Sequence, residues 1–502
     1  MGVHFMPEKT CSIADLMERS GVAFGTSGAR GPVTAMTDRT CFAYALAFLR
    51  HAAREGEFGP GQPVALAGDL RPSTPRILRA CAAAVESLDG IPLDCGFVPS
   101  PALALHAFAG AMPSMMVTGS HIPDDRNGIK FNRAASELLK PDEAAMRADC
   151  VPLEEALFDA DGMLRTPSAP GAPVDVEREY IARYLDFYGP DALKGAKLGL
   201  YQHSAVGRDL LLRLLEALGA RVTPFGRSDR FIPVDTEAVR EEDRALAARI
   251  ARAHDFDAIL STDGDSDRPL LADERGEWLR GDVLGILCAR AIGATHVATP
   301  VSSNSALEKS GWFSGTARTR IGSPFVIEAM NSLSADSGRI VCGYEANGGF
   351  LLDTDIVNAQ GRALKRLPTR DAVLPMLATL ILSRQSGMSL RTLVGTLPPR
   401  YTYSDRLKAF PSAISKQHLD RLREGSLETR LARLSEMFGA ISGTAVDIDT
   451  VDGLRIRFAN EEVIHLRPSG NAPELRCYTE ADTPGRAQAM AEAVLALLEG
   501  WR

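Results

Sequence analysis

A strand–turn–helix unit occurs at least twice along the chain and limits the fold to a few architectures. "PVALAGDLRPSTPRILRACAAAVESLDGIPLDCG", from Pro63, and "AKLGLYQHSAVGRDLLLRLLEALGARVTPFG", from Ala196, each run from a short apolar strand through a polar turn into an amphipathic helix and then a second strand. A weaker third copy begins near residue 295. Repeated βα units favour parallel or mixed sheets covered by helices. The sequence therefore predicts an α/β fold with several similar domains.

The length of 502 residues is too great for one hydrophobic core, so several domains are expected. The Pro- and Gly-rich stretch "RTPSAPGAPVD" is typical of a linker, and polar turns near residues 278 and 396 are the next candidate boundaries. The last part alternates apolar and polar residues around a hairpin turn at Asp452 and Gly453. We predict three α/β domains with mixed sheets at 1–170, 171–278 and 279–396, and a smaller C-terminal α+β domain at 397–502.

The charge and cysteine content argue against several classes of protein. With 64 acidic and 56 basic side chains the net charge is −8, which disfavours nucleic acid as a partner. No apolar run is long enough to cross a membrane, and the first 21 residues lack the apolar block of a signal peptide and predict a short helix. The 8 cysteines are scattered without a C-x-x-C pair, so we expect reduced thiols in the cytoplasm, most of them in the core.

Three apolar runs end abruptly in polar, glycine-rich loops: "SMMVTGSHIPDD", "DAILSTDGDSDR" and "IVCGYEANGG". Each follows the first strand of a βα unit at a similar interval. Ligand-binding loops lie at the carboxyl ends of strands in α/β sheets. We therefore expect each of the three similar domains to contribute one loop to a functional site.

The second loop holds the carboxylates Asp263, Asp265 and Asp267 at alternate positions, which places them on one side of an extended segment. Three adjacent carboxylates repel one another unless a cation neutralises them, and an all-oxygen ligand set favours Mg²⁺ or Ca²⁺ over zinc. An EF-hand is disfavoured because Arg268 and Pro269 replace its required residues and the preceding segment is predicted to be a strand. The loop therefore predicts a Mg²⁺ site that handles phosphate.

Ser120 lies in the first loop, "TGSHIPDDRNGIKF", and lacks the G-x-S-x-G setting of a hydrolase nucleophile. A serine hydroxyl is a weak nucleophile without a base or an electrophile beside it. Because Mg²⁺ often completes its shell with phosphate oxygens, Ser120 fits better as the carrier of a phosphoryl group. His121 and Lys130 are then candidates for moving a proton or contacting the phosphate.

Two further loops could hold phosphate. "FGTSGARGPV" places Arg30 among small residues that let a ligand approach the backbone closely. "LRPSGNAPELR" directly follows a predicted strand and offers a group of hydrogen-bond donors suited to a phosphate dianion. These donors are Arg467, Ser469, Gly470, Asn471 and Arg476.

Together the five loops resemble those of the phosphohexomutases, the phosphomannomutase and phosphoglucomutase superfamily, and most of all its bacterial phosphomannomutases. The loop order "GTSGARG", "TGSHIPDDRNGIKF", "DGDSDR", "GYEANGG", "RPSGNAPELR" is that of the family, and the match covers nearly the whole chain after about residue 20. This resemblance implies three α/β domains and a smaller fourth domain around a central cleft, with a phosphorylated serine and one Mg²⁺ per chain. We expect a cytoplasmic monomer or homodimer.

The resemblance implies a role for each matching residue. Ser120 is the implied phosphoserine, and its phosphate would bind the metal together with Asp263, Asp265 and Asp267. The residues implied in phosphoryl and proton transfer are Arg30, Arg268, Lys130 and His121. Glu345 and Asn347 would hold sugar hydroxyls. The substrate's own phosphate would be held by Arg467, Ser469, Gly470, Asn471 and Arg476.

The implied reaction interconverts mannose 6-phosphate and mannose 1-phosphate through a hexose 1,6-bisphosphate, which also serves as activator. Phosphoglucomutase activity, alone or combined, is the alternative, because glucose and mannose differ at carbon 2 whereas Glu345 and Asn347 are expected at the 3- and 4-hydroxyls. A phosphoglucosamine mutase is a weaker match. Other classes are a metal-dependent phosphatase, which would release inorganic phosphate, and an inactive regulatory homologue.

The chain departs from the family pattern at three places. Gly119 and Ile122 replace the commoner Ala and Asn in the serine loop. Gly349 stands where many bacterial members have a histidine in the sugar loop, so one hydrogen-bonding or proton-handling group lacks its usual residue. The phosphate loop reads "SGNAP" in place of S-N-T-E-P or S-G-T-E-P, which alters its set of donors.

Overall fold

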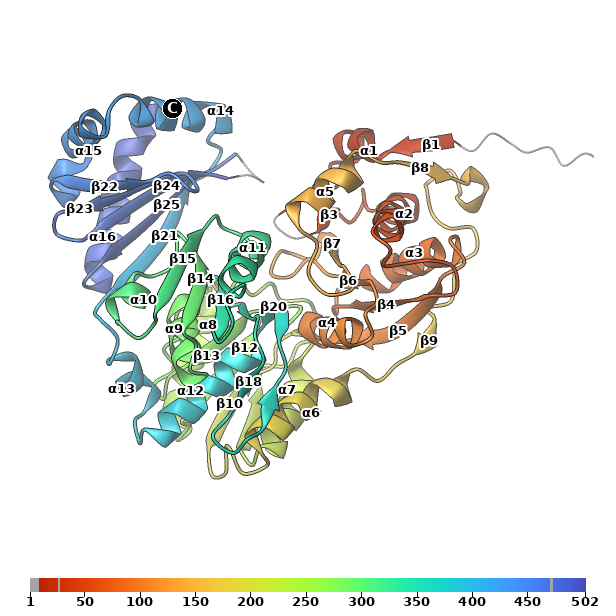
Figure 1. Ribbon diagram of the computed structural model, residues 1–502, viewed down its shortest axis with the longest axis horizontal. Helices are drawn as coiled ribbons and strands as arrows, with labels where there is room; N and C mark the ends of the chain where they lie inside the picture. The colour runs from red at the N-terminus through yellow and green to blue at the C-terminus, as the bar shows by residue number, and fades with distance from the viewer. Residues whose placement is uncertain (1–8, 26–27, 470–472) are drawn as a thin grey trace, which may run out of the picture. The chain divides into compact units, whose positions relative to one another are not determined.

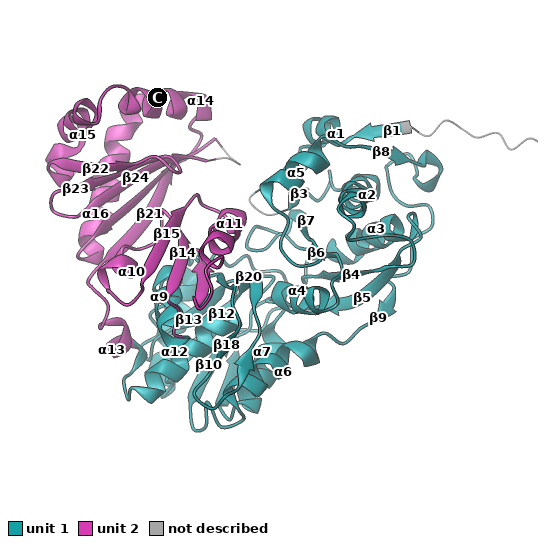
Figure 2. Cartoon of the chain, viewed as in Figure 1, with its two compact units in different colours: residues 1–292, 347–390 teal, residues 293–346, 391–502 magenta. Residues whose placement is uncertain are grey.

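The computed structural model describes residues 9–25, 28–469 and 473–502. The chain forms two compact units, each made of two chain segments (Figure 2). Unit 1 consists of Met1–Ile292 and Asn347–Leu390, and unit 2 of Gly293–Ala346 and Arg391–Arg502. The chain therefore passes from one unit to the other three times.

The first part of unit 1 contains a seven-stranded sheet in the order β2-β3-β7-β6-β4-β5-β9 (Figure 1). Its strands are β2 (Ala23–Phe24), β3 (Ala29–Pro32), β4 (Pro63–Gly68), β5 (Ile91–Phe97), β6 (Ser114–Val117), β7 (Arg126–Asn132) and β9 (Ala172–Pro173). The sheet is mixed, because β4 is parallel to β5 and β6 whereas β7 is antiparallel to β6. The predicted linker 165–175 contributes the short strand β9.

Helices and a two-stranded ribbon accompany this sheet. The helices are α1 (Ile13–Ser20), α2 (Asp38–Arg54), α3 (Thr74–Glu86), α4 (Ser100–Ala109), α5 (Lys140–Arg147) and the 3₁₀ helix η1 (Glu155–Leu157); β1 (Lys9–Ser12) pairs with β8 (Cys150–Leu153). α2 begins where the Thr37 side chain accepts a hydrogen bond from the Thr40 backbone N–H. Its apolar side chains pack into the core, where the Phe48 and Phe131 rings lie 4.9 Å apart.

The second part of unit 1 contains a four-stranded sheet in the order β11-β10-β12-β13. The strands are β10 (Lys197–Tyr201), β11 (Arg221–Phe225), β12 (Ala258–Thr262) and β13 (Pro269–Ala272), and the helices are α6 (Glu177–Tyr188), α7 (Arg208–Ala217), α8 (Glu241–Ala253) and α9 (Gly281–Ala291). β10 is parallel to β11 and β12, and β13 returns antiparallel to β12. Every residue of β12 is buried, which accounts for the apolar residues Ala258, Ile259 and Leu260 at its start.

The returning segment of unit 1 adds one strand pair, one small hairpin and one long helix. These are β17 (Phe350–Leu352) with β20 (Leu367–Asp371), β18 (Ile356–Val357) with β19 (Ala363–Leu364), and α12 (Val373–Gln385). α12 packs against α9 and is buried along most of its length. Both pairs are antiparallel.

Unit 2 combines a parallel βα segment with a five-stranded antiparallel sheet. The parallel strands run in the order β15-β14-β16, with β14 (His296–Pro300), β15 (Gly315–Thr319), β16 (Val341–Tyr344), α10 (Ala306–Lys309) and α11 (Ser323–Leu333). The antiparallel sheet has the order β21-β25-β24-β23-β22, with β21 (Tyr401–Leu407), β22 (Ala445–Asp449), β23 (Leu454–Phe458), β24 (Val463–Pro468) and β25 (Leu475–Ala481). The remaining helices are α13 (Leu390–Val394), α14 (Ser412–Arg423), α15 (Leu427–Ser442), α16 (Pro484–Leu498) and η2 (Glu499–Trp501).

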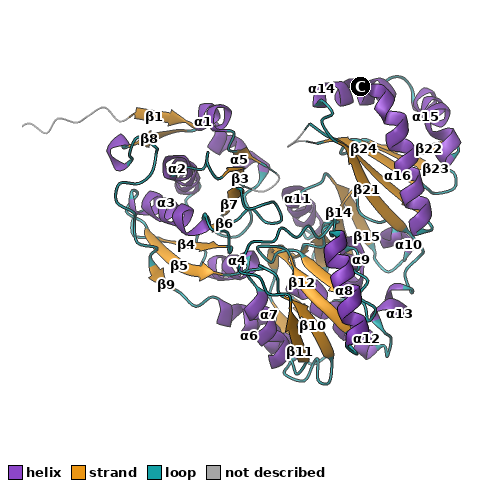
Figure 3. Cartoon of the chain, turned by 180° about the vertical axis from the view of Figure 1, so that it is seen from behind, coloured by secondary structure: helices purple, strands orange, loops and turns teal. Residues whose placement is uncertain are grey.

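The predicted fold class is confirmed (Figure 3). The three strand–turn–helix–strand units are β4-α3-β5, β10-α7-β11 and β14-α10-β15, and the C-terminal meander turns at Asp452–Gly453 as predicted. The helix predicted near the N-terminus is α1, which follows β1. The 8 cysteines are free thiols, of which 6 are buried.

In the described ranges we find no helix with the length and apolar character needed to span a membrane. The domain boundaries at 170, 278 and 396 remain predictions.

Candidate active site

Ser120 lies in the loop between β6 and β7 and is fully buried. Its backbone has φ +56°, a left-handed conformation that is uncommon for a residue other than glycine. Ser120 Oγ donates a hydrogen bond of 2.7 Å to Asp263 Oδ2, and the Ser120 backbone N–H donates to Thr118 Oγ1 at 2.8 Å. The structure thus brings the predicted phosphoserine into direct contact with the predicted metal loop.

Arg71 binds the backbone carbonyl oxygens of the Ser120 loop, a role that the sequence did not predict. Its side chain is fully buried and donates from Nη2 to the carbonyl oxygens of Ser120 (2.8 Å) and Ile122 (2.6 Å). Nη1 donates to the carbonyl oxygens of Pro123 and Arg126, Nε donates to Asp69 Oδ2, and the guanidinium lies 3.9 Å from the centre of the Phe231 ring. The only sequence signal was the polar turn "GDLRPS" after the first strand of a βα unit.

Gly119 is explained by the same contact. A Cβ atom at this position would lie 2.7 Å from Arg71 Cζ, closer than two such atoms can approach. Gly119 therefore lets the guanidinium pack against the backbone just before Ser120. The departure from the commoner Ala is a packing requirement of this loop.

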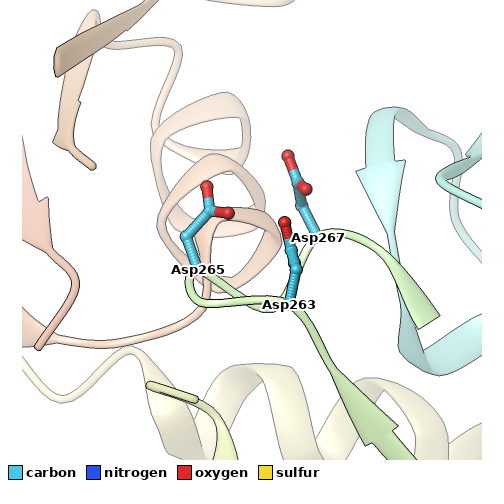
Figure 4. Close-up of side chains that lie close together, drawn as sticks. All are labelled: Asp263, Asp265 and Asp267. Atoms are coloured by element: carbon cyan, nitrogen blue, oxygen red, sulfur yellow. The ribbon is translucent and has the colours of Figure 1, made fainter. Parts of the chain in front are cut away.

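The three aspartates follow β12 and point to the same side of their loop (Figure 4). Asp263 and Asp265 are fully buried, Asp267 is 2% exposed, and one oxygen of each lies within 4.8 Å of the others. Ser100 Oγ donates to Asp265 Oδ2 at 2.6 Å. A Cβ atom at Gly264 would come within 2.6 Å of the Ser120 carbonyl oxygen, so this glycine allows the two loops to meet.

Several cations surround the aspartates. Lys130 Nζ, from β7, donates to Asp265 Oδ2 and Asp267 Oδ2. Arg268 Nε lies 3.9 Å from Asp263 Oδ2 and 3.7 Å from Asp267 Oδ1. A residue that the sequence interpretation missed, Arg370 on β20, places Nε 3.2 Å from Asp267 Oδ2. Burial, then Arg268 and Arg370, lower the pKa of Arg30 to about 10, so Arg30 belongs to the same group of positive charges.

The donor set fits a divalent cation. Within the described part of the chain, Asp265 Oδ1 and Asp267 Oδ1 are buried and have no hydrogen-bond partner. Burial and the two neighbouring carboxylates raise the pKa of Asp263 well above its usual value, and a bound cation would offset this repulsion. Oxygen ligands of this kind suit Mg²⁺.

His121 is held as a neutral ring. Burial and the nearby Arg268 guanidinium lower its pKa well below the usual value. His121 Nδ1 accepts a hydrogen bond from Arg268 Nη1 at 2.7 Å and lies 3.3 Å from Ser120 Oγ. The contact with Arg268 occupies the lone pair of Nδ1, so this nitrogen does not accept a proton from Ser120 Oγ, which donates to Asp263.

The residues of the predicted sugar pair belong to different units: Glu345 is the penultimate residue of the first segment of unit 2, and Asn347 is the first residue of the returning segment of unit 1. Glu345 follows β16 and is buried. Asn347 Oδ1 accepts a hydrogen bond from the Gly349 backbone N–H at 3.0 Å, and the Asn347 carbonyl accepts one from Thr236 Oγ1 at 2.7 Å. The Asn347 side chain is thus set by its own turn.

The predicted phosphate loop joins β24 and β25 in unit 2. Arg467 Nε donates to Asp452 Oδ1 at 2.9 Å, and Arg467 faces Arg476 in the register of the two strands. The Ser469 backbone N–H donates to the Glu474 carbonyl at 2.8 Å. Gly470 and Asn471 lie outside the described residues. Arg467, Ser469 and Arg476 therefore gather at one end of this sheet.

Four stretches match the phosphoglucomutase/phosphomannomutase family: residues 21–150 match its α/β/α domain I, 178–276 its domain II, 280–401 its domain III and 420–497 its C-terminal domain. A phosphomannomutase from Salmonella muenchen is 44% identical over 96% of both chains. The chain belongs to this family. A phosphomannomutase from Sinorhizobium fredii is 42% identical, covering 95% of this chain and 99% of the relative.

A solved structure shares the fold of this family member. The phosphoglucomutase/phosphomannomutase family protein from Burkholderia thailandensis superposes with a TM-score of 0.71 at 18% identity, covering 95% of this chain and 97% of that protein. At this identity the likeness concerns the fold alone. The family resemblance predicted from the five loops is confirmed.

Proposed function

We propose that the chain is a phosphomannomutase that interconverts mannose 6-phosphate and mannose 1-phosphate through a phosphoserine at Ser120 and a hexose 1,6-bisphosphate. The observation that carries this proposal is the hydrogen bond of 2.7 Å between Ser120 Oγ and Asp263 Oδ2, inside a cluster of three buried carboxylates. The names of the two relatives above 40% identity support mannose as the sugar.

The phosphoryl transfer assigns one role to each group around Ser120. The sugar hydroxyl oxygen attacks the phosphorus, the bond between phosphorus and Ser120 Oγ breaks, and Ser120 Oγ takes a proton while the hydroxyl loses one. Lys130 is the proposed proton carrier, because His121 Nδ1 accepts from Arg268. Arg30 and Arg268 stabilise the charge on the transferring group.

Mg²⁺, one per chain, is the proposed metal, with Asp263, Asp265, Asp267 and the Ser120 phosphate as its ligands. When bound it neutralises phosphoryl charge and polarises the phosphorus–oxygen bonds. The support is the pair of buried oxygens, Asp265 Oδ1 and Asp267 Oδ1, that have no hydrogen-bond partner among the described residues. A soft or nitrogen-preferring metal has no suitable ligand in this set.

The second phosphate of the substrate is assigned to unit 2. Arg467 and Arg476 supply charge, and Ser469, Gly470 and Asn471 supply further donors. Glu345 and Asn347 are assigned to the sugar hydroxyls. Because the intermediate carries phosphate at both ends, either phosphate must fit this site in turn, and reorientation of the bisphosphate returns the other phosphate to Ser120.

Glucose is the alternative sugar, since Glu345 and Asn347 are expected at the 3- and 4-hydroxyls whereas glucose and mannose differ at carbon 2. A relative from Thermococcus kodakarensis, 26% identical over 95% of this chain, bears the name phosphoglucomutase/phosphomannomutase.

We also propose the cytoplasm as the location, which the free thiols support. The proposed domains are 1–170, 171–278, 279–396 and 397–502.

The test is to incubate the protein, Mg²⁺ and a trace of glucose 1,6-bisphosphate with mannose 1-phosphate and, separately, glucose 1-phosphate, while following formation of the 6-phosphates and of inorganic phosphate. Isomerisation of mannose 1-phosphate without phosphate release is expected. Release of phosphate would identify a phosphatase instead. Intact-mass analysis should find a phosphorylated fraction in the wild type and none in Ser120→Ala.

A further inference from the structure

Arg370 is a buried guanidinium at the proposed metal site that none of the five loops contains. It lies on β20, is 2% exposed, and places Nε 3.2 Å from Asp267 Oδ2 and 3.9 Å from Glu137 Oε1. Lys130 Nζ donates to the same Asp267 oxygen. Asp267 Oδ2 therefore faces two cations.

The strand that carries Arg370 is fixed on both sides. Thr369 Oγ1 donates to Glu137 Oε1 at 2.7 Å, and the Arg370 backbone N–H donates to the same oxygen at 3.4 Å. The next residue, Asp371, accepts hydrogen bonds from the Tyr180 and Tyr184 hydroxyls. Because adjacent strand residues point to opposite faces, this anchor holds β20 while Arg370 points to the site.

Gly349 makes the space that the Arg370 side chain occupies. A Cβ atom at Gly349 would lie 2.8 Å from Arg370 Cγ and 2.9 Å from Cδ. The Gly349 backbone is not among the glycines with positive φ, so the Arg370 side chain, and not the backbone, excludes a larger residue there. Gly349 and Arg370 are thus complementary.

The charges around Asp267 show what Arg370 contributes. Asp267 Oδ1 is buried, has no hydrogen-bond partner within the described ranges and lies 3.7 Å from Arg268 Nε, whereas Oδ2 lies closer to two cations, Lys130 and Arg370. A cation that holds one carboxylate oxygen leaves the other oriented toward a metal. If Lys130 leaves Asp267 to move a proton, Arg370 remains, so the buried carboxylate is not left without a countercharge.

We infer that Arg370 is a positioning residue that holds Asp267 Oδ2 so that Oδ1 is presented to the metal, and that Gly349 is the small residue that admits it. This inference rests on the proposed function only for the identity of the metal site. It assigns to the pair Gly349 and Arg370 a role in metal affinity.

The test is direct titration of the full-length protein with Mn²⁺ alone, in the absence of sugar, by calorimetry or by electron paramagnetic resonance of the free ion. Arg370→Met should weaken Mn²⁺ binding by about 10-fold or more, and Arg370→Lys should recover part of that loss. Arg366→Met is the control, because Arg366 lies one residue before β20 and pairs with Asp353. It should bind Mn²⁺ like the wild type.

Gly349→Ala tests the same idea without changing the arginine. Gly349→Ala alone should weaken Mn²⁺ binding. Added to Arg370→Met it should have no further effect, because the guanidinium that the methyl group displaces is then absent. Equal or tighter Mn²⁺ binding by Arg370→Met, or independent effects of the two changes, would overturn the inference. Because no sugar is present, these outcomes do not depend on whether the protein isomerises mannose 1-phosphate.

Discussion

Arg71 Nη2 donates a hydrogen bond of 2.8 Å to the carbonyl oxygen of Ser120, a residue whose backbone has φ +56°. A left-handed conformation at a residue other than glycine costs about 1–3 kcal/mol and persists only when the surroundings enforce it. Arg71 binds four carbonyl oxygens of the loop and so supplies that enforcement. The position of Ser120 Oγ next to Asp263 depends on an arginine that does not contact Oγ.

Replacing Arg71 with Lys keeps a positive charge beside Asp69 but cannot bind the four carbonyl oxygens at once. We expect kcat for mannose 1-phosphate to fall by about 100-fold while KM changes by less than about 3-fold, since the loop positions the phosphoryl carrier and not the sugar. Steady-state kinetics measure both. Arg318→Lys is the matched control, because Arg318 binds the Pro300, Ser303 and Asn304 carbonyls in unit 2. A similar fall in kcat for Arg318→Lys would mean that general destabilisation explains the effect.

Gly119→Ala places a methyl group against the Arg71 guanidinium. In the wild-type structure a Cβ added at Gly119 would lie 2.7 Å from Arg71 Cζ, so either the loop or the guanidinium must move in the variant. We expect the phosphorylated fraction and kcat to drop by about 10-fold or more, with a smaller further drop when Arg71→Lys is already present. Intact mass and kinetics of the four proteins complete the cycle. Full activity of the single variant would show that the loop tolerates the methyl group.

Asp263→Asn removes a charge from the carboxylate cluster but keeps its shape. We expect the Mg²⁺ concentration for half-maximal activity to rise by about 10-fold or more, and kcat to fall even at saturating Mg²⁺. Asp273→Asn is the control, since the buried Asp273 carboxylate accepts from the Arg275 and Glu277 backbone N–H groups just after β13. An unchanged Mg²⁺ requirement in Asp263→Asn would exclude that carboxylate as a ligand.

His203 makes the stability of the fold depend on pH. Burial lowers its pKa to about 4, opposed by its hydrogen bond to the Thr262 carbonyl. Between about pH 6.5 and pH 4, His203 is therefore protonated in the unfolded chain but neutral in the folded chain. The free energy of unfolding falls as the pH falls through this window, by about 2 kcal/mol at pH 5. Urea unfolding at about pH 7 and about pH 5 should show a smaller loss in His203→Asn than in the wild type. Equal losses would assign the pH dependence to other groups.

Much of the fold could be predicted because the βα units carry their own periodicity. The apolar runs of β6, β12 and β16 end where the sequence predicted, and Ser120 and Asp263 follow the first two of them. The aspartate cluster could be predicted for a similar reason, since alternate residues of an extended loop share a side. These features depend on local sequence.

Arg71 and Arg370 could not be predicted, because each acts through contacts with residues far away in the sequence. Arg71 binds a loop 49 to 55 positions further on, and a polar turn after a strand gives no sign of that. Gly349 was recognised as a missing side chain, but its explanation lies in the packing of Arg370. The proposal that Lys130 carries the proton also draws on the structure, because His121 Nδ1 accepts a hydrogen bond from Arg268 Nη1.

The interleaving of the two units determines when each unit can fold during synthesis of the chain. Unit 1 needs residues up to Leu390, and the first segment of unit 2, Gly293–Ala346, leaves the ribosome before that point. At a rate of synthesis of about 5–20 residues per second, several seconds pass between the synthesis of β14, β15 and β16 and that of the C-terminal part of unit 2. During that interval the apolar side chains that these strands bury in the folded unit, such as Val297 and Val341, lack the rest of their unit, a state that favours aggregation.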